Sequence, residues 1–203
     1  PVSRRQERGS LSFGLSRYSV WLGRRDACGV EEWAFAGRAD ELRRLRELVV
    51  RTERGGVVLA GPPGVGKTRL AVECLRLAER AGLVTARVTA TRSAAELPFG
   101  ALAPLLPGKD RRPGAVDDRA DLLRRWGSAL VERAGGGRLV LLVDDAHLLD
   151  GSSATLVHQQ VASGAVVVVA TVLSGEPAPD PVSALWKDGL TERIDLGGLG
   201  REA

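Results

Sequence analysis

The chain has 203 residues, 44% of them hydrophobic, which is enough to bury one ordinary core and predicts a single folded domain. Two cysteines and no Cys/His cluster with zinc spacing exclude a disulfide-stabilised miniprotein and predict a reducing, cytoplasmic location. The longest apolar run, 165–173, is much shorter than the ~18 residues of a membrane span, so we expect no membrane partner.

The net charge of +4 comes from the first 30 residues, where six arginines accompany two acids. This Ser/Arg-rich segment has no apolar periodicity, so we expect residues 1–30 to form a disordered leader before a folded core at 31–203. The core itself is neutral, which gives no support to DNA binding by the core. Because position 1 is Pro rather than Met, we also expect a piece of a longer polypeptide.

The first predicted elements form a strand, a glycine-rich loop and a helix. Leucines at helical spacing predict an amphipathic helix over 38–52, and after two glycines an apolar run predicts a buried strand at 57–60. The glycine-rich segment 61–68 comes next, followed by a helix that reaches Arg80 and stops before Gly82. This succession is a βα unit.

Strands and helices then alternate to the end of the chain. We expect strands at 83–90, 139–143, 166–172 and 193–196, and helices at 97–106, 118–134, 152–162 and 181–187. Such alternation predicts an α/β fold with a parallel sheet covered by helices on both faces. The segment 107–117, rich in Pro and Gly, is predicted to be a loop within one domain.

The segment 61–68 matches the phosphate-loop pattern G-x-x-x-x-G-K-[ST], and it lies between a predicted strand and a predicted helix as that motif requires. Phosphates need several converging backbone N–H donors, and the helix N-terminus adds its positive dipole end. We expect Lys67 to bind the β- and γ-phosphates and to act in catalysis, and the Thr68 hydroxyl to bind Mg²⁺. The predicted nucleotide-binding residues of this segment are Gly61, Pro62, Pro63, Gly64, Val65, Gly66, Lys67, Thr68 and Arg69.

Two carboxylates follow the strand predicted at 139–143. Asp144 and Asp145 stand at the carboxyl end of that strand, where ligands bind in open α/β sheets. We expect Asp144 to hold Mg²⁺ through water and Asp145 to orient or deprotonate the attacking water. Aspartate is one methylene shorter than glutamate, so efficient hydrolysis does not follow from Asp145.

A complete strand, 83–90, separates the phosphate loop from the acidic strand in sequence, which is typical of the branch of nucleoside triphosphatases (NTPases) that places another strand between those two in the sheet. Thr171 then ends a strand where a polar side chain could sense the γ-phosphate. It could equally be a β-branched residue selected for strand packing. His147 could contact the site, although a structural role for this histidine is the simpler interpretation.

Three segments extend a resemblance beyond the phosphate loop. They are 35–42, which includes Gly37 and Arg38, 96–102 and 184–189. With these segments the chain resembles the ATP-binding, AAA+/STAND-like module of the large LuxR-family transcriptional regulators of actinobacteria. The resemblance covers residues 35–199.

The resemblance implies a P-loop NTPase three-layer sandwich whose five-stranded parallel sheet has the order 5-1-4-3-2. It implies ATP and Mg²⁺ as cofactors, Gly37 and Arg38 beside the adenine, DNA binding only through a missing C-terminal helix-turn-helix, and self-association in the full-length protein. A helical lid would also be absent. Two departures matter. The family usually has an arginine two residues after the position of Thr171, where this chain has Leu173, and an aromatic residue commonly follows the histidine of its acidic motif, where this chain has Leu148.

These observations favour an ATP-binding signal-transduction switch with slow or partner-dependent hydrolysis. Two alternatives stay open: a small phosphotransferase, which would begin with the same loop, and the ATPase module of another signalling protein. The acidic pair after a strand fits switching or hydrolysis better than transfer, and 107–135 offers no convincing lid for an acceptor.

Overall fold

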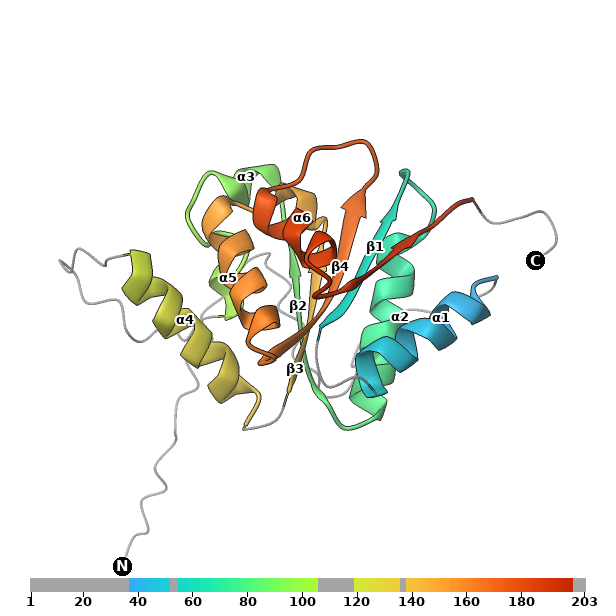
Figure 1. The fold of residues 1–203 in the computed structure, drawn as a ribbon, viewed down its shortest axis with the longest axis horizontal. Helices are drawn as coiled ribbons and strands as arrows, with labels where there is room; N and C mark the ends of the chain where they lie inside the picture. The colour runs from blue at the N-terminus through green and yellow to red at the C-terminus, as the bar shows by residue number, and fades with distance from the viewer. Residues whose placement is uncertain (1–36, 52–54, 106–118, 136–137, 199–203) are drawn as a thin grey trace, which may run out of the picture.

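The structure is a computed structural model, which describes residues 37–51, 55–105, 119–135 and 138–198. The predicted leader at 1–30 and the whole of the predicted loop at 107–117 lie outside the described residues. The described part forms a three-layer α/β sandwich, with one parallel sheet between two layers of helices (Figure 1).

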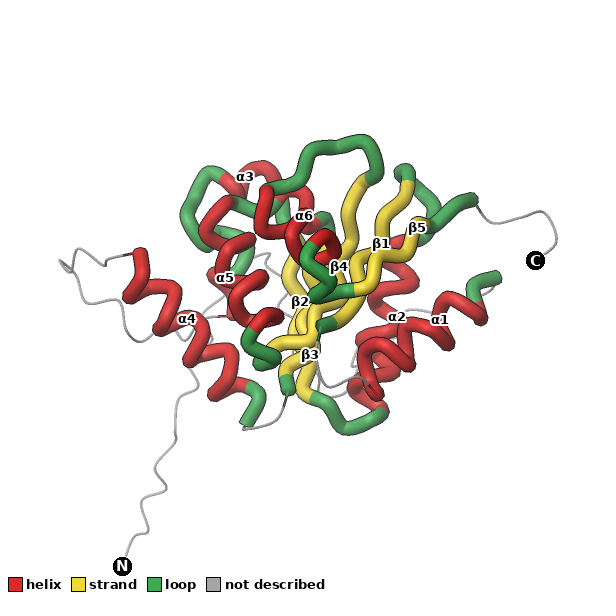
Figure 2. The backbone as a smooth tube through the Cα atoms, in the orientation of Figure 1, coloured by secondary structure: helices red, strands yellow, loops and turns green. Residues whose placement is uncertain are grey.

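The sheet contains five strands: β1 (Gly56–Gly61), β2 (Val84–Thr89), β3 (Leu139–Asp144), β4 (Val166–Leu173) and β5 (Glu192–Asp195). The α-helices are α1 (Ala39–Arg46), α2 (Lys67–Arg80), α3 (Arg92–Ala95), α4 (Arg119–Arg133), α5 (Gly151–Ala162) and α6 (Asp180–Lys187). A π-helical turn, Glu47–Arg51, continues α1, and two 3₁₀ turns lie at Ala103–Leu105 and Ala146–Leu148. Figure 2 shows these elements by type.

The strand order across the sheet is β2-β3-β4-β1-β5, and every pairing is parallel. This is the expected order 5-1-4-3-2 read from the other edge. β4 therefore separates β1, which leads into the phosphate loop, from β3, which ends at Asp144. The carboxyl ends of β1, β3 and β4 consequently meet at one edge of the sheet.

Both faces of the sheet are buried, because β1, β3 and β4 are almost entirely apolar. Alternate residues of these strands contribute to two cores. On one face, Leu59, Leu142 and Val169 lie in a core with Leu45 and Leu70, which come from α1 and α2. The opposite core includes residues of α4, α5 and α6 (Figure 1).

The predicted helix at 97–106 is wrong. Helix α3 instead begins earlier, where the Thr91 side chain accepts a hydrogen bond from the amide of Ala94, and it ends at Ala95. Turns follow, with Phe99 at a φ of 61°, and a 3₁₀ turn forms at Ala103–Leu105. The Asp150 carboxylate accepts the Phe99 amide at 3.1 Å, so a contact from the start of α5 sets the path of this segment.

Within the described residues no helix has the length and apolarity to cross a membrane. Cys74 is a free, buried thiol in the core under α2. Burial raises the pKa of this thiol from 9.0 to about 12, because the thiolate would lose its hydration there. Cys74 is therefore an unreactive core residue at neutral pH.

Candidate functional site: the carboxyl edge of the sheet

The phosphate loop joins β1 to α2. Gly64 and Gly66 have φ angles of 77° and 90°, which L-residues with a side chain rarely adopt, and a Cβ at either position would meet no atom within 4 Å. Gly61 is required for a different reason, since its Cβ would lie 2.6 Å from the Leu196 carbonyl oxygen of the neighbouring β5 segment. The loop thus curls over open space at the N-terminus of a 14-residue helix.

Three backbone N–H donors of this loop are unpaired in the described part of the chain. Among the residues that the structure describes, the backbone amides of Gly64, Val65 and Gly66 donate no hydrogen bond to the protein. Lys67, only 8% exposed, directs its Nζ at two loop carbonyls, those of Gly61 at 3.0 Å and Pro62 at 2.9 Å. The arrangement gathers unpaired N–H groups, an ammonium and a helix N-terminus in one concave turn, which favours an anion.

Asp144 occupies the opposite side of the site. It is 4% exposed, and three side chains from three elements hold its carboxylate. Oδ1 accepts the hydroxyl of Thr68 at 2.9 Å and that of Thr171 at 2.8 Å, and Oδ2 accepts Nη2 of Arg87 at 3.0 Å. The Thr68–Asp144 contact joins the phosphate loop directly to the acidic strand end, as a Mg²⁺ site shared by these two residues would need.

Thr171 is fully buried, and its single hydroxyl links both aspartates. The hydroxyl donates to Asp144 and accepts the backbone amide of Asp145 at 2.8 Å. Asp145 itself has a φ of 56°, so the chain turns sharply directly after the strand. Within the described residues, no side chain forms a hydrogen bond or an ion pair with the Asp145 carboxylate, which is half-buried and available to a ligand or water.

Arg87 is the residue that sequence reasoning missed. It lies on β2, in register with Leu142, and reaches Asp144 along the face of the sheet that α2 covers. One signal was present in the sequence, since an arginine in the middle of a predicted buried strand requires a charged partner. The identity of that partner depends on β2 lying beside β3, which the strand pattern alone does not give.

Arg38 connects three segments that are far apart in sequence. Its guanidinium is buried, donates to the carbonyls of Val65 at 2.9 Å and Gly197 at 2.6 Å, and pairs with Glu41 at 3.0 Å. It therefore fastens the start of α1 and the end of β5 to the phosphate loop. Gly37 precedes it with a φ of 85°. Contact of either residue with adenine stays a prediction.

Leu173 is the last residue of β4, and its amide donates to Nδ1 of His147 at 3.4 Å. His147 thus links the 3₁₀ turn that follows Asp145 to the end of β4, which is a structural role. Leu173 supplies no charge at the position where the LuxR-family regulators, which the sequence resembles, usually have arginine.

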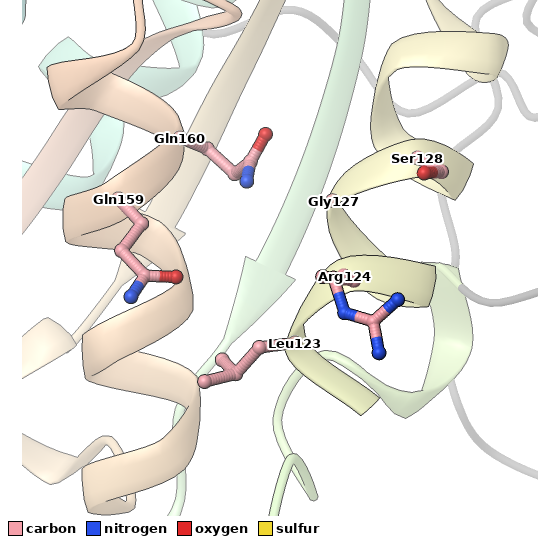
Figure 3. A pocket seen from close by; sticks show the side chains of 6 residues that line it. All are labelled: Leu123, Arg124, Gly127, Ser128, Gln159 and Gln160. Atoms are coloured by element: carbon pink, nitrogen blue, oxygen red, sulfur yellow. The ribbon is translucent and has the colours of Figure 1, made fainter. Parts of the chain in front are cut away.

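A groove lies between α4 and α5, with a volume of about 400 Å³ (Figure 3). Its lining residues are Leu123, Arg124, Gly127, Ser128, Gln159 and Gln160. None of them belongs to the phosphate loop or to the carboxyl ends of the strands. The groove is therefore separate from the candidate nucleotide site.

The AAA ATPase domain model matches residues 34–169, which is more than half of the chain. The chain belongs to the AAA ATPase domain family. Among solved structures it is similar to Cdc6p from Pyrobaculum aerophilum, with 16% identity, a TM-score of 0.50, and coverage of 77% of this chain and 44% of that one. It also matches the Pif1 helicase from Candida albicans, with 17% identity, a TM-score of 0.48, and coverage of 81% and 40%.

The chain spans less than half the length of both matched structures. The similarity to Cdc6p concerns the fold alone. An AAA ATPase domain implies a nucleotide and usually Mg²⁺, and the residues present here fit both. The open amides and Lys67 suit a polyphosphate. The Thr68 hydroxyl and the Asp144 carboxylate are oxygen ligands of the kind that Mg²⁺ prefers.

Proposed function

We propose that this AAA ATPase domain is an ATP-binding switch module of a LuxR-type transcriptional regulator, with slow hydrolysis of its own. The observation that carries the proposal is the direct bond between Thr68 and Asp144, which joins the open phosphate loop to the acidic strand end. Lys67 and the loop amides would bind the phosphates, and Thr68 and Asp144 would hold Mg²⁺, which supplies positive charge to the phosphates when bound.

Slow hydrolysis follows from the groups around Asp145. Among the residues that the structure places at this edge of the sheet, this carboxylate is the one candidate for orienting water, and its side chain is one methylene shorter than that of glutamate. Leu173 leaves the position two residues after Thr171 without the arginine that the LuxR-type regulators usually have there. Arginine supplied to a transferring phosphoryl group accounts for orders of magnitude in rate. We therefore expect bound ATP to persist, as a switch ligand requires.

The role in a LuxR-type regulator is supported by the resemblance of the segments at 35–42, 96–102 and 184–189. In the structure the first fastens α1 to the phosphate loop through Arg38, and the second is held to α5 through Phe99 and Asp150. Both are thus attached to the nucleotide edge of the sheet. In this proposal another part of the regulator contacts DNA, and the ATP-bound or ADP-bound state of this domain controls that contact.

The binding proposal is tested by isothermal titration of Mg-ATP and Mg-ADP into the wild type and Lys67→Met. We expect at least about a 100-fold loss of affinity in Lys67→Met, because the variant removes the charge that faces the phosphates. Lys187→Met removes an exposed lysine at the end of α6 and is the matched control. Equal affinities in the wild type and Lys67→Met would refute the proposal.

The switching proposal is tested by phosphate release and a DNA mobility shift. Turnover should stay well below about 1 per second, the low end of ordinary enzymes, and no phosphate should move to an added acceptor. The chain should give no sequence-specific shift of DNA. Transfer to an acceptor would favour the phosphotransferase alternative, and fast turnover would contradict a slow switch.

A further inference from the structure

Arg87 is the one charged group that contacts Asp144 within the described residues. Its Nη2 lies 3.0 Å from Oδ2 of Asp144, whereas the hydroxyls of Thr68 and Thr171 both donate to Oδ1. A nearly fully buried carboxylate is costly without a counter-charge, so Arg87 neutralises Asp144 when no other cation is present.

The same carboxylate is the proposed Mg²⁺ ligand. A divalent ion held by Thr68 and Asp144 would share the Asp144 carboxylate with the Arg87 guanidinium. Two cations beside one carboxylate are close enough to repel each other. The repulsion is weakly screened because Asp144 is buried. Mg²⁺ binding and the Arg87–Asp144 ion pair therefore oppose each other.

The Arg87 side chain is able to move away from Asp144. Its side chain is about one third exposed, and Asp144 is its one side-chain partner among the described residues. It lies on β2, which is at one edge of the sheet, and β3 is its one neighbouring strand in the part of the chain that the structure describes. The long side chain can turn toward solvent without disturbing the apolar core, to which Ala86 and Val88 of the same strand belong.

We propose that Arg87 is the resident counter-ion of Asp144 and thereby sets the Mg²⁺ concentration at which the domain binds nucleotide tightly. The inference rests on the proposed nucleotide and Mg²⁺ binding and adds a regulatory residue to that site. With Arg87 in place, tight binding begins only at a higher Mg²⁺ concentration. The nucleotide-free domain is stabilised by the same ion pair.

The test compares Arg87→Gln, which removes the charge and keeps a hydrogen-bond donor, with Arg87→Lys, which keeps the charge. Calorimetric titrations of ADP at a series of Mg²⁺ concentrations give the Mg²⁺ midpoint for tight binding. We expect the midpoint to fall about five-fold or more in Arg87→Gln and to stay within about two-fold in Arg87→Lys. Arg92→Gln, at an exposed arginine of α3, controls for the loss of one positive charge.

A second readout is thermal unfolding with and without Mg-ADP. In EDTA the Arg87→Gln variant should melt below the wild type, and Mg-ADP should raise its melting temperature by more than it raises that of the wild type. A role confined to folding would lower melting and leave the Mg²⁺ midpoint unchanged.

An unchanged or higher midpoint in Arg87→Gln overturns the inference. If Arg87→Gln does not fold, Arg87→Met serves as the second uncharged variant. If neither folds even with Mg-ADP, the ion pair is a structural brace and the inference is overturned as well. If the wild type binds no Mg-ADP, the proposed function is refuted. If the wild type binds Mg-ADP but Arg87→Gln has the same Mg²⁺ midpoint as the wild type, this inference alone is refuted.

Discussion

The two charged side chains at the centre of the site are held in different ways. Lys67 bonds to two carbonyls of its own loop, five and six residues away. Asp144 bonds to side chains 27, 57 and 76 residues away, on three other elements. The cation is therefore placed by local backbone geometry, and the anion is placed by the assembled sheet.

This difference separates binding from stability. The carbonyls that hold Lys67 belong to the backbone, and a substitution of Lys67 leaves them where they are. The partners of Asp144 are side-chain hydroxyls and a guanidinium, which lose their acceptor when Asp144 is changed. Substitutions on the anionic side should thus destabilise the fold most, and those on the cationic side should mainly affect ligand binding.

The largest effect on stability is expected for Asp144→Asn. The amide leaves Arg87 beside a neutral group and places a donor against a donor, which should cost about 3 kcal/mol of unfolding free energy in urea. Asp145→Asn is the matched control, because Asn tolerates the positive φ and the Asp145 carboxylate has no described side-chain partner. Equal losses from both variants would remove the distinction between the two aspartates.

The second largest loss of unfolding free energy, about 2 kcal/mol, is expected for Arg38→Ala. The variant leaves the Val65 and Gly197 carbonyls without their buried donor and removes the pair with Glu41. Chemical unfolding gives the loss, and Arg43→Ala, which breaks an exposed ion pair of the same helix, should cost much less. A loss no greater than that of Arg43→Ala would show that Arg38 does not fasten the phosphate loop.

Thr171→Val should cost about 1 kcal/mol, since it removes the hydroxyl between Asp144 and the Asp145 amide at constant shape. Thr89→Val, at the exposed end of β2, is the control. If Thr171→Val instead lowers ATP affinity and leaves stability intact, the hydroxyl acts as the predicted γ-phosphate sensor rather than as a brace.

The smallest effect on stability is expected for Lys67→Met, below about 0.5 kcal/mol, because the side chain keeps its volume, the Gly61 carbonyl still accepts the Ser174 amide, and the Pro62 carbonyl belongs to an exposed residue. The same variant should lose tight nucleotide binding. Urea unfolding beside the calorimetric titration shows both results. A large loss of stability would mean that Lys67 holds the loop together and would undo the contrast with Asp144.

The sequence predicts what depends on neighbours along the chain. The strand, glycine loop and helix at 57–80, and the acidic pair after the strand at 139–143, follow from spacing and periodicity and are present in the structure. The predicted order of strands also agrees, although it came from a resemblance.

Prediction from the sequence fails where contacts with distant residues determine the local structure or the partner of a side chain. The segment 97–106 has an apolar pattern that suits a helix, but the Asp150 carboxylate takes the Phe99 amide from 51 residues away and favours turns. Arg87 could be noted as a charge in a strand, yet its partner is fixed only when β2 pairs with β3. Both cases depend on contacts between elements, which local patterns do not contain.

Gly61 bears on how the glycines of a phosphate loop are interpreted in other chains. Its lack of a side chain makes room for the β5 segment, with the Leu196 carbonyl 2.6 Å from where a Cβ would lie, whereas Gly64 and Gly66 face open space. A descendant that gave up nucleotides would still need glycine at position 61 to keep the β5 segment in place, whereas positions 64 and 66 need glycine only as long as the loop keeps its positive φ angles. The second and third glycines are therefore the informative ones when a motif of this kind is used to infer binding.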